Sequence, residues 1–291
     1  LPAFHGQFGE DGCIQGLFEL ADVPYAGCGV LSSAAAMNKY HCKCLLHAHG
    51  IPVLPAAVVP KAAAQSGLNK VLAQIYGTKG LEEFPLFVKP GNLGSSIGVS
   101  RAKDETELNA ALAKVFELDN EAIVEPCVVN LLEINVSVLE GDKGPEASVV
   151  EIPVASAGVL TYEDKYMRQG KGKKGSGRSV QGMAGLTRVI DPEDLAPEIK
   201  AAVVRFALEA FRILGCAGVV RFDFMLDLDT NQLYFNELNP LPGSMAHYLW
   251  VKSKPPVLYT ELLTRIIEGA CRRKALSAGL KRDLGFRALS G

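Results

Sequence analysis

Two neighbouring runs of alternating residues constrain the fold of this chain most. They lie within Arg221 to Asn239, which read RFDFMLDLDTNQLYFNELN. In the first run the apolar residues share one face and Asp223 shares the other with Arg221, which is the period of two that a β-strand requires. The turn DLDTN then leads to a second run, in which Glu237 and Asn239 share a face. We expect a β-hairpin that places Asp223 across from Glu237 and Asn239.

Oxygen-bearing side chains on a sheet face need an explanation. Like charges that face each other across two strands are destabilising unless a cation lies between them. Magnesium takes oxygen ligands and usually keeps bonds to substrate phosphates, so Asp223, Glu237 and Asn239 are predicted to hold a nucleotide-bound magnesium. The alternative is a solvated hairpin face.

Two further segments have features of phosphate binding. Lys89 ends an apolar strand and precedes GNLGSSIG, whose glycines would let backbone N–H groups approach an anion. This is not the P-loop pattern, and an ordinary hairpin turn is the alternative. A long loop from Glu163 to Gly185 carries Lys165, Arg168 and a basic tract, and it is suited to close over a triphosphate. Its alternative is an exposed loop without a partner.

The composition is that of a globular protein of two or three domains, because 48% of its 291 residues are hydrophobic. A formal net charge of −2 gives no reason to expect nucleic acid or a membrane surface as partner. The seven cysteines are scattered, which favours a reducing, cytoplasmic setting. No apolar run is long enough to span a bilayer.

The remaining elements follow from periodicity and capping signals. The segment from Leu1 to Gly29 is predicted to form a strand, a loop, a helix and a short strand, and Ser32 or Ser33 to cap a helix that runs through His49 and stops at Gly50. Further strands and helices are expected at Phe84–Lys89, Asp104–Phe116, Ala122–Glu125, Glu133–Leu139, Ala147–Ile152, Val159–Tyr162, Leu186–Val189, Pro192–Leu214 and Pro256–Arg273.

Four stretches, in this order, closely resemble the D-alanine:D-alanine ligase family of ATP-grasp enzymes. They are HGQFGEDGCIQGLFELADVPYAGCGVLSSAAAMNK, FPLFVKPGNLGSSIGVS, TYEDKY and RFDFMLDLDTNQLYFNELNPLPGS, and the resemblance runs from about His5 to Arg273. It implies an α/β and α+β chain with an ATP-grasp fold. Two α+β subdomains (30–125 and 126–275) would enclose the nucleotide, preceded by part of a Rossmann-like domain (1–29) and followed by a tail (276–291).

The resemblance implies an ATP-dependent, ADP-forming ligase that joins two D-alanines for peptidoglycan synthesis. ATP and Mg²⁺ or Mn²⁺ are the implied cofactors, D-amino acids the substrates, and a cytoplasmic homodimer the full-length form. A ligase that takes D-serine, D-lactate or another amine second is an alternative, and so is a nucleotide-binding module without turnover.

Site residues are carried over by motif. Asp223, Glu237 and Asn239 resemble the magnesium ligands, Arg221 the arginine that stabilises the tetrahedral intermediate, and Gly243 its backbone oxyanion donor. The expected nucleotide-binding residues are Lys39, Lys89, Ser96, Glu125, Val128, Glu133 and Lys165, with Lys165 reaching the γ-phosphate. The pair Tyr166 and Ser95 resembles the hydrogen bond that locks the loop shut, and the substrate pocket would contain His5, Glu10, Gly243, Ser244 and Tyr248.

Three departures from the family pattern also carry expectations. A further N-terminal segment with a glutamate for the first substrate's ammonium is absent, so we expect the natural protein to be longer. Tyr248 falls near a serine that binds the second substrate's carboxylate, and a phenol could donate one hydrogen bond there. Tyr166 favours dipeptide formation over ester formation with D-lactate.

Overall fold

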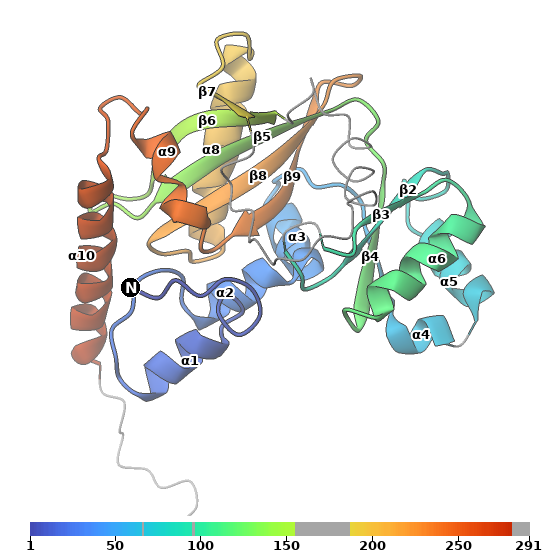
Figure 1. Ribbon diagram of the computed structural model, residues 1–291, viewed down its shortest axis with the longest axis horizontal. Coiled ribbons are helices and arrows are strands. Elements are labelled where there is room, and N and C mark those ends of the chain that lie inside the picture. Colours follow the sequence, from blue (N-terminus) through green and yellow to red (C-terminus); the bar gives the residue numbers. More distant parts are fainter. Residues whose placement is uncertain (66, 95–96, 155–186, 281–291) are drawn as a thin grey trace, which may run out of the picture.

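Two antiparallel sheets organise the residues that the computed structural model describes, which are 1–65, 67–94, 97–154 and 187–280 (Figure 1). The smaller sheet has the strand order β1-β4-β2-β3, and the larger sheet has the order β7-β6-β5-β8-β9. The expected segments Val159–Tyr162 and Glu163–Gly185 lie outside the described residues.

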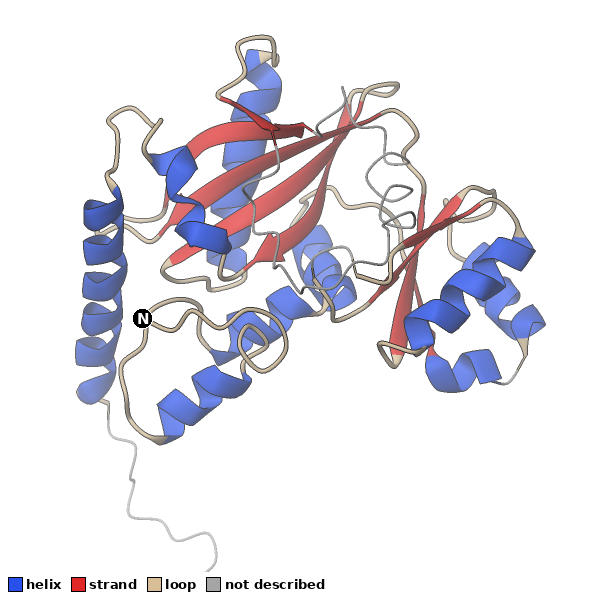
Figure 2. Cartoon of the chain, viewed as in Figure 1, coloured by secondary structure: helices blue, strands red, loops and turns tan. Residues whose placement is uncertain are grey.

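The smaller sheet is built from residues that are close in sequence. Its strands are β1 (Ala57–Pro60), β2 (Leu86–Pro90), β3 (Ser100–Ala102) and β4 (Glu121–Pro126). The helices α4 (Lys61–Gln65), α5 (Leu68–Tyr76) and α6 (Glu105–Phe116) gather on one side of it (Figure 2). The predicted strands and helix of this region are confirmed, and the Asp104 side chain caps α6 by accepting a hydrogen bond from the Glu107 N–H at 2.9 Å.

The larger sheet contains the hairpin that the alternating runs predicted. Its strands are β5 (Leu131–Leu139), β6 (Glu146–Val154), β7 (Thr187–Ile190), β8 (Val219–Asp227) and β9 (Gln232–Asn239). Strands β8 and β9 pair antiparallel with Asp223 opposite Glu237 and Arg221 opposite Asn239, so the expected facing of these side chains is confirmed. The apolar face of the hairpin packs into the largest core cluster, together with residues of α8 (Pro197–Ile213).

The predicted helix from Ser32 or Ser33 to His49 is wrong in one respect, because two helices take its place. They are α2 (Val30–Met37) and α3 (Lys39–Ala48), and Asn38 between them is extended. The Asn38 side chain accepts a hydrogen bond from the His41 N–H at 2.9 Å and thus starts α3 as an N-cap. Ser32 and Ser33 lie buried inside α2 and do not cap it. Gly50 ends α3 as expected, with a φ of 83°.

The strands expected in residues 1–29, all of which are described, do not form. The one regular element there is α1 (Cys13–Leu20). Leu1 and Phe4 are exposed, and none of the described strands pairs with this segment. A strand without a hydrogen-bonded neighbour has no ladder to stabilise it, which is why the apolar pattern alone does not produce one.

The C-terminal region adds short elements that periodicity did not indicate. A 3-10 turn, η3 (Gly243–Ala246), and α9 (His247–Trp250) follow β9, and α10 (Tyr259–Ala278) ends the described chain. The predicted helix at Pro256–Arg273 thus begins and ends later than expected, and that at Pro192–Leu214 begins later, at Pro197. None of the described helices combines the length and apolarity needed to cross a bilayer.

Candidate functional site

A row of polar residues crosses the larger sheet on the face opposite its main core. The register places Glu151 of β6 opposite Asn135 of β5, Asn135 opposite Asp223 of β8, and Asp223 opposite Glu237 of β9. Directly opposite residues of antiparallel strands project to the same face. Polar side chains from four strands therefore line one continuous surface.

Arg221 and Asp223 form the centre of this surface. The Arg221 Nε and Nη2 atoms each donate a hydrogen bond of 2.7 Å to one Asp223 carboxylate oxygen, and Asn239 Nδ2 donates to Asp223 Oδ2 at 3.0 Å. Burial raises the pKa of Asp223, Arg221 lowers it, and the nearby Glu237 and Glu133 carboxylates raise it further. Burial and the two carboxylates thus outweigh Arg221, and a further cation beside Asp223 would favour its ionised form.

The donor set fits a hard divalent cation. Asp223 and Glu237 offer carboxylate oxygens and Asn239 a carboxamide, all from adjacent strands. Within the part of the chain that the structure describes, no group of three or more His, Cys, Asp and Glu residues could hold a metal by itself. Magnesium is commonly held by only one or two carboxylates, with waters and substrate phosphates as its other ligands, so this partial set suits it.

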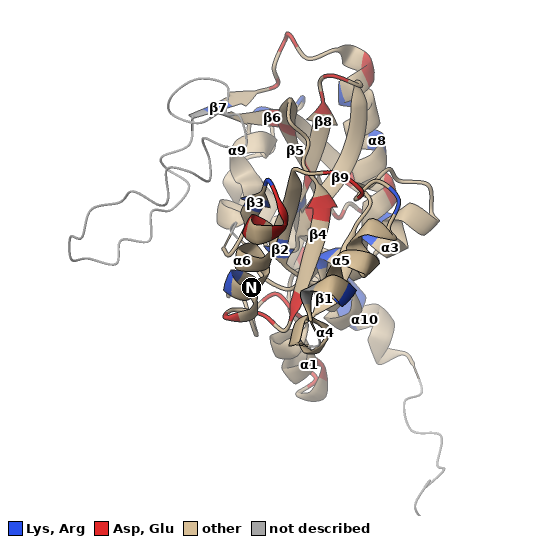
Figure 3. Cartoon of the chain, turned by 90° about the vertical axis from the view of Figure 1, so that its right-hand side faces the viewer, with Lys and Arg blue, Asp and Glu red and all other residues tan. Residues whose placement is uncertain are grey.

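Lys39 connects the two sheets at the edge of this surface. Its ammonium lies 3.3 Å from Glu237 Oε2 and donates to the Leu93 carbonyl at 2.6 Å, while its backbone N–H donates to the Gly91 carbonyl at 3.0 Å. An acidic segment of β9 and the basic start of α3 thereby meet, and Figure 3 shows red and blue segments near these two elements. Burial disfavours ionised Glu237, but Lys39, Lys89 and Arg221 outweigh it and lower its pKa.

A buried triad of charged side chains adjoins Lys39. Lys89 Nζ of β2 lies 2.5 Å from Glu125 Oε2 of β4, and Lys43 of α3 contacts the other oxygen, Glu125 Oε1. The exposed fractions of Lys43, Lys89 and Glu125 are only 2%, 4% and 2%. Burial opposes ionisation of Glu125, but Lys43 and Lys89 lower its pKa to about 2. Sequence reasoning missed Lys43, although its position four residues after Lys39 on one helix was a usable signal.

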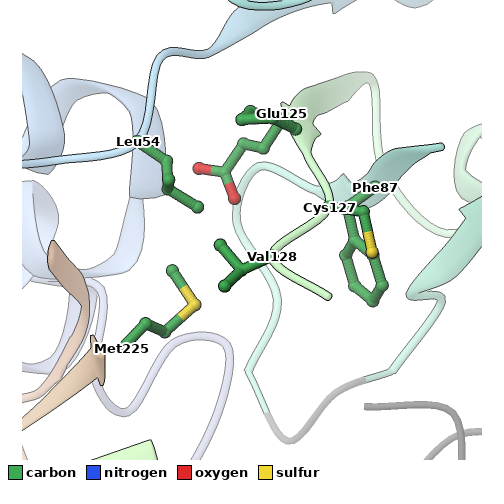
Figure 4. Close-up of a pocket in the computed structure, with 7 residues that line it drawn as sticks. Leu54, Phe87, Glu125, Cys127, Val128 and Met225 are labelled. Carbon is green, nitrogen blue, oxygen red and sulfur yellow. The ribbon is translucent and has the colours of Figure 1, made fainter. Parts of the chain in front are cut away.

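Glu125 and Val128 meet in a small pocket between the two sheets. Its wall consists of Leu54, Phe87, Glu125, Pro126, Cys127, Val128 and Met225. Figure 4 shows the Glu125 carboxylate directed into the space between Leu54 and Val128. Ligand sites commonly combine apolar walls with a few polar groups, and these walls share that character. Glu133 lies nearby on β5, opposite Met225.

The turn after β9 has an unusual backbone. Ser244, Met245 and Ala246 have φ values of 51°, 55° and 50°, and the Met245 N–H donates to the Pro242 carbonyl at 2.8 Å. Residues other than glycine rarely adopt this left-handed conformation, and it costs about 1–2 kcal/mol each. Such strain is concentrated at functional sites. The turn contains Gly243 and Ser244 and packs against β8, which carries Arg221.

Tyr248 of α9 stands over the other end of the polar row. Its hydroxyl donates to Glu151 Oε1 at 2.7 Å, and the Arg188 guanidinium lies 4.2 Å from its ring centroid. Burial and Glu151 raise the pKa of Tyr248 to about 12, so the phenol keeps its proton near neutral pH. The expected hydrogen bond to a substrate carboxylate would require this proton, which the structure directs to Glu151.

His5 and Glu10 meet within the loop that precedes α1. His5 Nδ1 lies 3.8 Å from Glu10 Oε1, and Glu10 Oε2 accepts a hydrogen bond from the Gly6 N–H at 2.5 Å. Burial raises the pKa of Glu10, and the hydrogen bond from Gly6 and the nearby His5 offset this rise only in part. The contact with Gly6 is that of a loop cap, and the substrate-binding role of this pair stays a prediction.

Four predicted site residues, Ser95, Ser96, Lys165 and Tyr166, lie outside the described residues. The other predicted nucleotide and metal residues gather where the two sheets meet. The structure therefore shows that the described nucleotide and metal residues lie close together, and the role of each one stays a prediction.

Comparison with known proteins agrees with this geometry. A family model described as the D-ala D-ala ligase C-terminus matches residues 45–268, and one described as the D-ala D-ala ligase N-terminus matches residues 1–28. A D-alanine–D-alanine ligase of Ruminiclostridium cellulolyticum is 38% identical over 276 residues, which are 94% of this chain and 68% of that protein.

Solved structures of similar proteins share the fold. The D-alanine–D-alanine ligase of Coxiella burnetii has a TM-score of 0.74 at 30% identity. The match includes 95% of this chain and 68% of the Coxiella chain. The VanG D-Ala:D-Ser ligase of Enterococcus faecalis has a TM-score of 0.72 at 28% identity, over 91% of this chain and 71% of that one. The ATP-grasp fold that the resemblance implied is confirmed. Most of the length of the chain is matched both in sequence and in structure, and the chain therefore belongs to the D-alanine–D-alanine ligase family.

Proposed function

We propose that this chain joins two D-alanines to D-alanyl-D-alanine for peptidoglycan, with ATP converted to ADP and phosphate. The carboxylate of the first D-alanine attacks the γ-phosphate of ATP, and ADP leaves. The amine of the second D-alanine then attacks the acyl carbon, phosphate leaves, and the amine loses a proton. The 38% identity to a named D-alanine–D-alanine ligase over 94% of the chain is the observation that carries this proposal.

The polar surface supports the metal-dependent part of the reaction. Asp223, Glu237 and Asn239 would hold Mg²⁺ or Mn²⁺, because they offer oxygen donors from adjacent strands. When bound, the ion neutralises charge on the phosphates. Lys39 and Lys89 supply further positive charge from the neighbouring elements.

The nucleotide base is assigned to the pocket of Glu125 and Val128, and the ribose to Glu133, whose pairing partner Met225 lines that pocket. Ser96 and Lys165 are assigned to the phosphates through the resemblance alone. Tyr166 and Ser95 are assigned in the same way to closure of the loop over the nucleotide.

Arg221 and the backbone N–H of Gly243 are proposed to stabilise the negative charge that develops on the acyl oxygen. The Arg221 guanidinium is held rigidly by its two bonds to Asp223, and a fixed donor needs little rearrangement during the reaction. His5, Glu10, Ser244 and Tyr248 complete the proposed amino-acid pockets. A cytoplasmic homodimer is the proposed full-length form.

The test is ADP release by the full chain with ATP, Mg²⁺ and D-alanine, with the product identified by mass. D-Alanyl-D-alanine formed in step with ADP is the expected result. ADP release that requires D-serine or D-lactate would reassign the second substrate. Bound ATP without release under any of these conditions, by this chain and by a version extended upstream, would refute ligase activity.

A further inference from the structure

Lys43 has no role in the site as described, although it is among the most deeply buried charged groups of the molecule. Its side chain is 2% exposed and contacts Glu125 Oε1. An ammonium ion in the interior needs a compensating anion, and burial lowers the pKa of Lys43 to about 8 despite the attraction of Glu125. Buried ionisable groups with strongly shifted pKa values are concentrated at functional sites, so Lys43 is a candidate for a functional role.

The charges of the triad do not balance. Glu125 carries one negative charge, whereas Lys43 and Lys89 carry two positive charges between them. Without Lys43, Glu125 and Lys89 would form a neutral pair, and the Lys89 ammonium would offer little net attraction to an anion. With Lys43 present, Glu125 is neutralised from the side of α3, and the triad keeps one net positive charge beside the nucleotide pocket.

The contacts also fix the direction of Lys89. Glu125 presents one oxygen to each lysine, so Lys43 prevents the carboxylate from turning both oxygens toward Lys89. Lys89 Nζ lies 3.4 Å from Asn236 Oδ1 on β9, next in sequence to Glu237. The ammonium is therefore held between β4 and β9, which carries the proposed metal ligands Glu237 and Asn239.

We infer that Lys43 is a positioning residue for nucleotide phosphate binding: it neutralises and orients Glu125, so that the triad keeps a net positive charge and the Lys89 ammonium can attract the phosphates. This inference rests on the proposed function. Lys43 acts through Glu125 and Lys89, and it has no required contact with the base or the ribose. Its removal thus affects ligands with phosphates and spares adenosine.

The test is calorimetric titration of the full chain with ADP and, separately, with adenosine. Lys43→Met is expected to weaken ADP binding about 10- to 100-fold and to change adenosine binding by less than about twofold. The first range is that found when a group that orients a metal ligand is removed, and Lys43 would orient Glu125 in a similar way. Lys43→Arg keeps the charge and is expected to retain ADP affinity. Lys200→Met is the matched control, because Lys200 pairs with Asp191 at 3.0 Å, outside the site.

Equal losses for ADP and adenosine would overturn the inference, because they would mean that Lys43 only supports the shape of the base pocket. Unchanged ADP affinity in Lys43→Met would overturn it as well. In activity assays the variant is expected to raise the KM for ATP with little change in kcat. The difference between ADP and adenosine does not involve D-alanine, so a wild-type chain that makes no dipeptide would refute the proposed function and leave this test intact.

A pH series provides a second measurement should Lys43→Met fail to fold. The charged and titratable groups around Lys43 are Glu125, Lys89 and Cys42, and burial raises the pKa of the Cys42 thiol to about 12, so that it stays neutral. Between pH 7 and 9 Lys43 loses its proton, and wild-type ADP affinity is expected to fall relative to adenosine affinity. Lys43→Arg is expected to remove this fall, and the same fall in that variant would overturn the inference.

Discussion

Replacing Glu125 by Gln should lower the stability of this protein, whereas replacing Lys43 by Met should leave it unchanged or raise it. Both substitutions remove one charge from the same buried triad and nearly preserve side-chain volume. Glu125→Gln leaves the ammonium ions of Lys43 and Lys89 buried without an anion. Lys43→Met instead leaves the matched pair of Glu125 and Lys89.

The magnitudes follow from the two pKa values. The pKa of Glu125 falls from 4.5 to about 2, so its ionised form stabilises the folded state by about 3 kcal/mol at pH 7. This value agrees with the cost of about 3–5 kcal/mol for the loss of one partner of a buried ion pair. The pKa of Lys43 falls from 10.5 to about 8, which means that its charge costs the folded state about 3 kcal/mol at pH 7. Lys43→Met should thus leave stability unchanged or raise it by up to that amount.

Equilibrium unfolding in urea provides the assay, with far-UV circular dichroism and the fluorescence of Trp250 as two probes. Trp250 is the single tryptophan and is 2% exposed. With a slope of about 3 kcal/mol/M, Glu125→Gln should lower the midpoint by about 1–2 M. A lysine whose folded pKa is lowered becomes less destabilising as the pH rises, so at pH 9 part of the Glu125→Gln loss should be recovered.

The reasoning would be refuted by a Glu125→Gln protein within about 1 kcal/mol of wild type, since no other mechanism in the triad offsets an unpaired buried ammonium. Equal destabilisation by both substitutions would refute it too, because the asymmetry depends on two cations sharing one anion. A Glu125→Gln loss that grows between pH 7 and 9 would contradict the sign of the Lys43 contribution.

Three further outcomes are expected. Glu237→Ala should abolish ADP release, because it removes a carboxylate of the proposed metal site; an active variant would remove Glu237 from that site. Tyr248→Phe should cost about 1 kcal/mol of stability in the same urea assay, since it removes the hydrogen bond to Glu151, and a stabilised variant would contradict that bond's contribution. Lys165→Ala should reduce turnover far more than ADP binding measured by calorimetry, and equal losses would count against a γ-phosphate role.

The hairpin of β8 and β9 could be predicted from sequence because its information is local. Alternation assigns the side chains of β8 to two faces, and the short turn sets the pairing as far as Phe224 opposite Phe235. An irregularity between Asp223 and Phe224 then shifts the register by one residue, so that Asp223 lies opposite Glu237 rather than Asn236, and neither alternation nor the turn indicates that shift. The end of α2 at Asn38 could not be predicted from the residue pattern. The alanine-rich run is compatible with one helix, and only the side-chain cap of Asn38 on His41 shows that a second helix begins there.

Lys43 could not be assigned a partner from the sequence, since Glu125 lies 82 residues away and no local pattern joins them. The left-handed turn at Ser244 was equally hidden. Its residues have no glycine-like preference for positive φ, so tertiary packing must impose the conformation. Local patterns thus predicted the strands, whereas contacts across the two sheets were needed to complete the site.

The placement of α2 and α3 has a consequence for the order in which the chain folds. These helices contribute Ala36, Cys42 and Leu46 to the same core as β8 and β9, and the preceding residue Cys28 contacts the Ala217 carbonyl 189 positions later. A ribosome therefore releases both helices long before their packing partners exist. The smaller sheet, whose strands all lie between Ala57 and Pro126, can form meanwhile. Until β9 emerges, the apolar faces of the early helices stay open to chaperones and to neighbouring nascent chains.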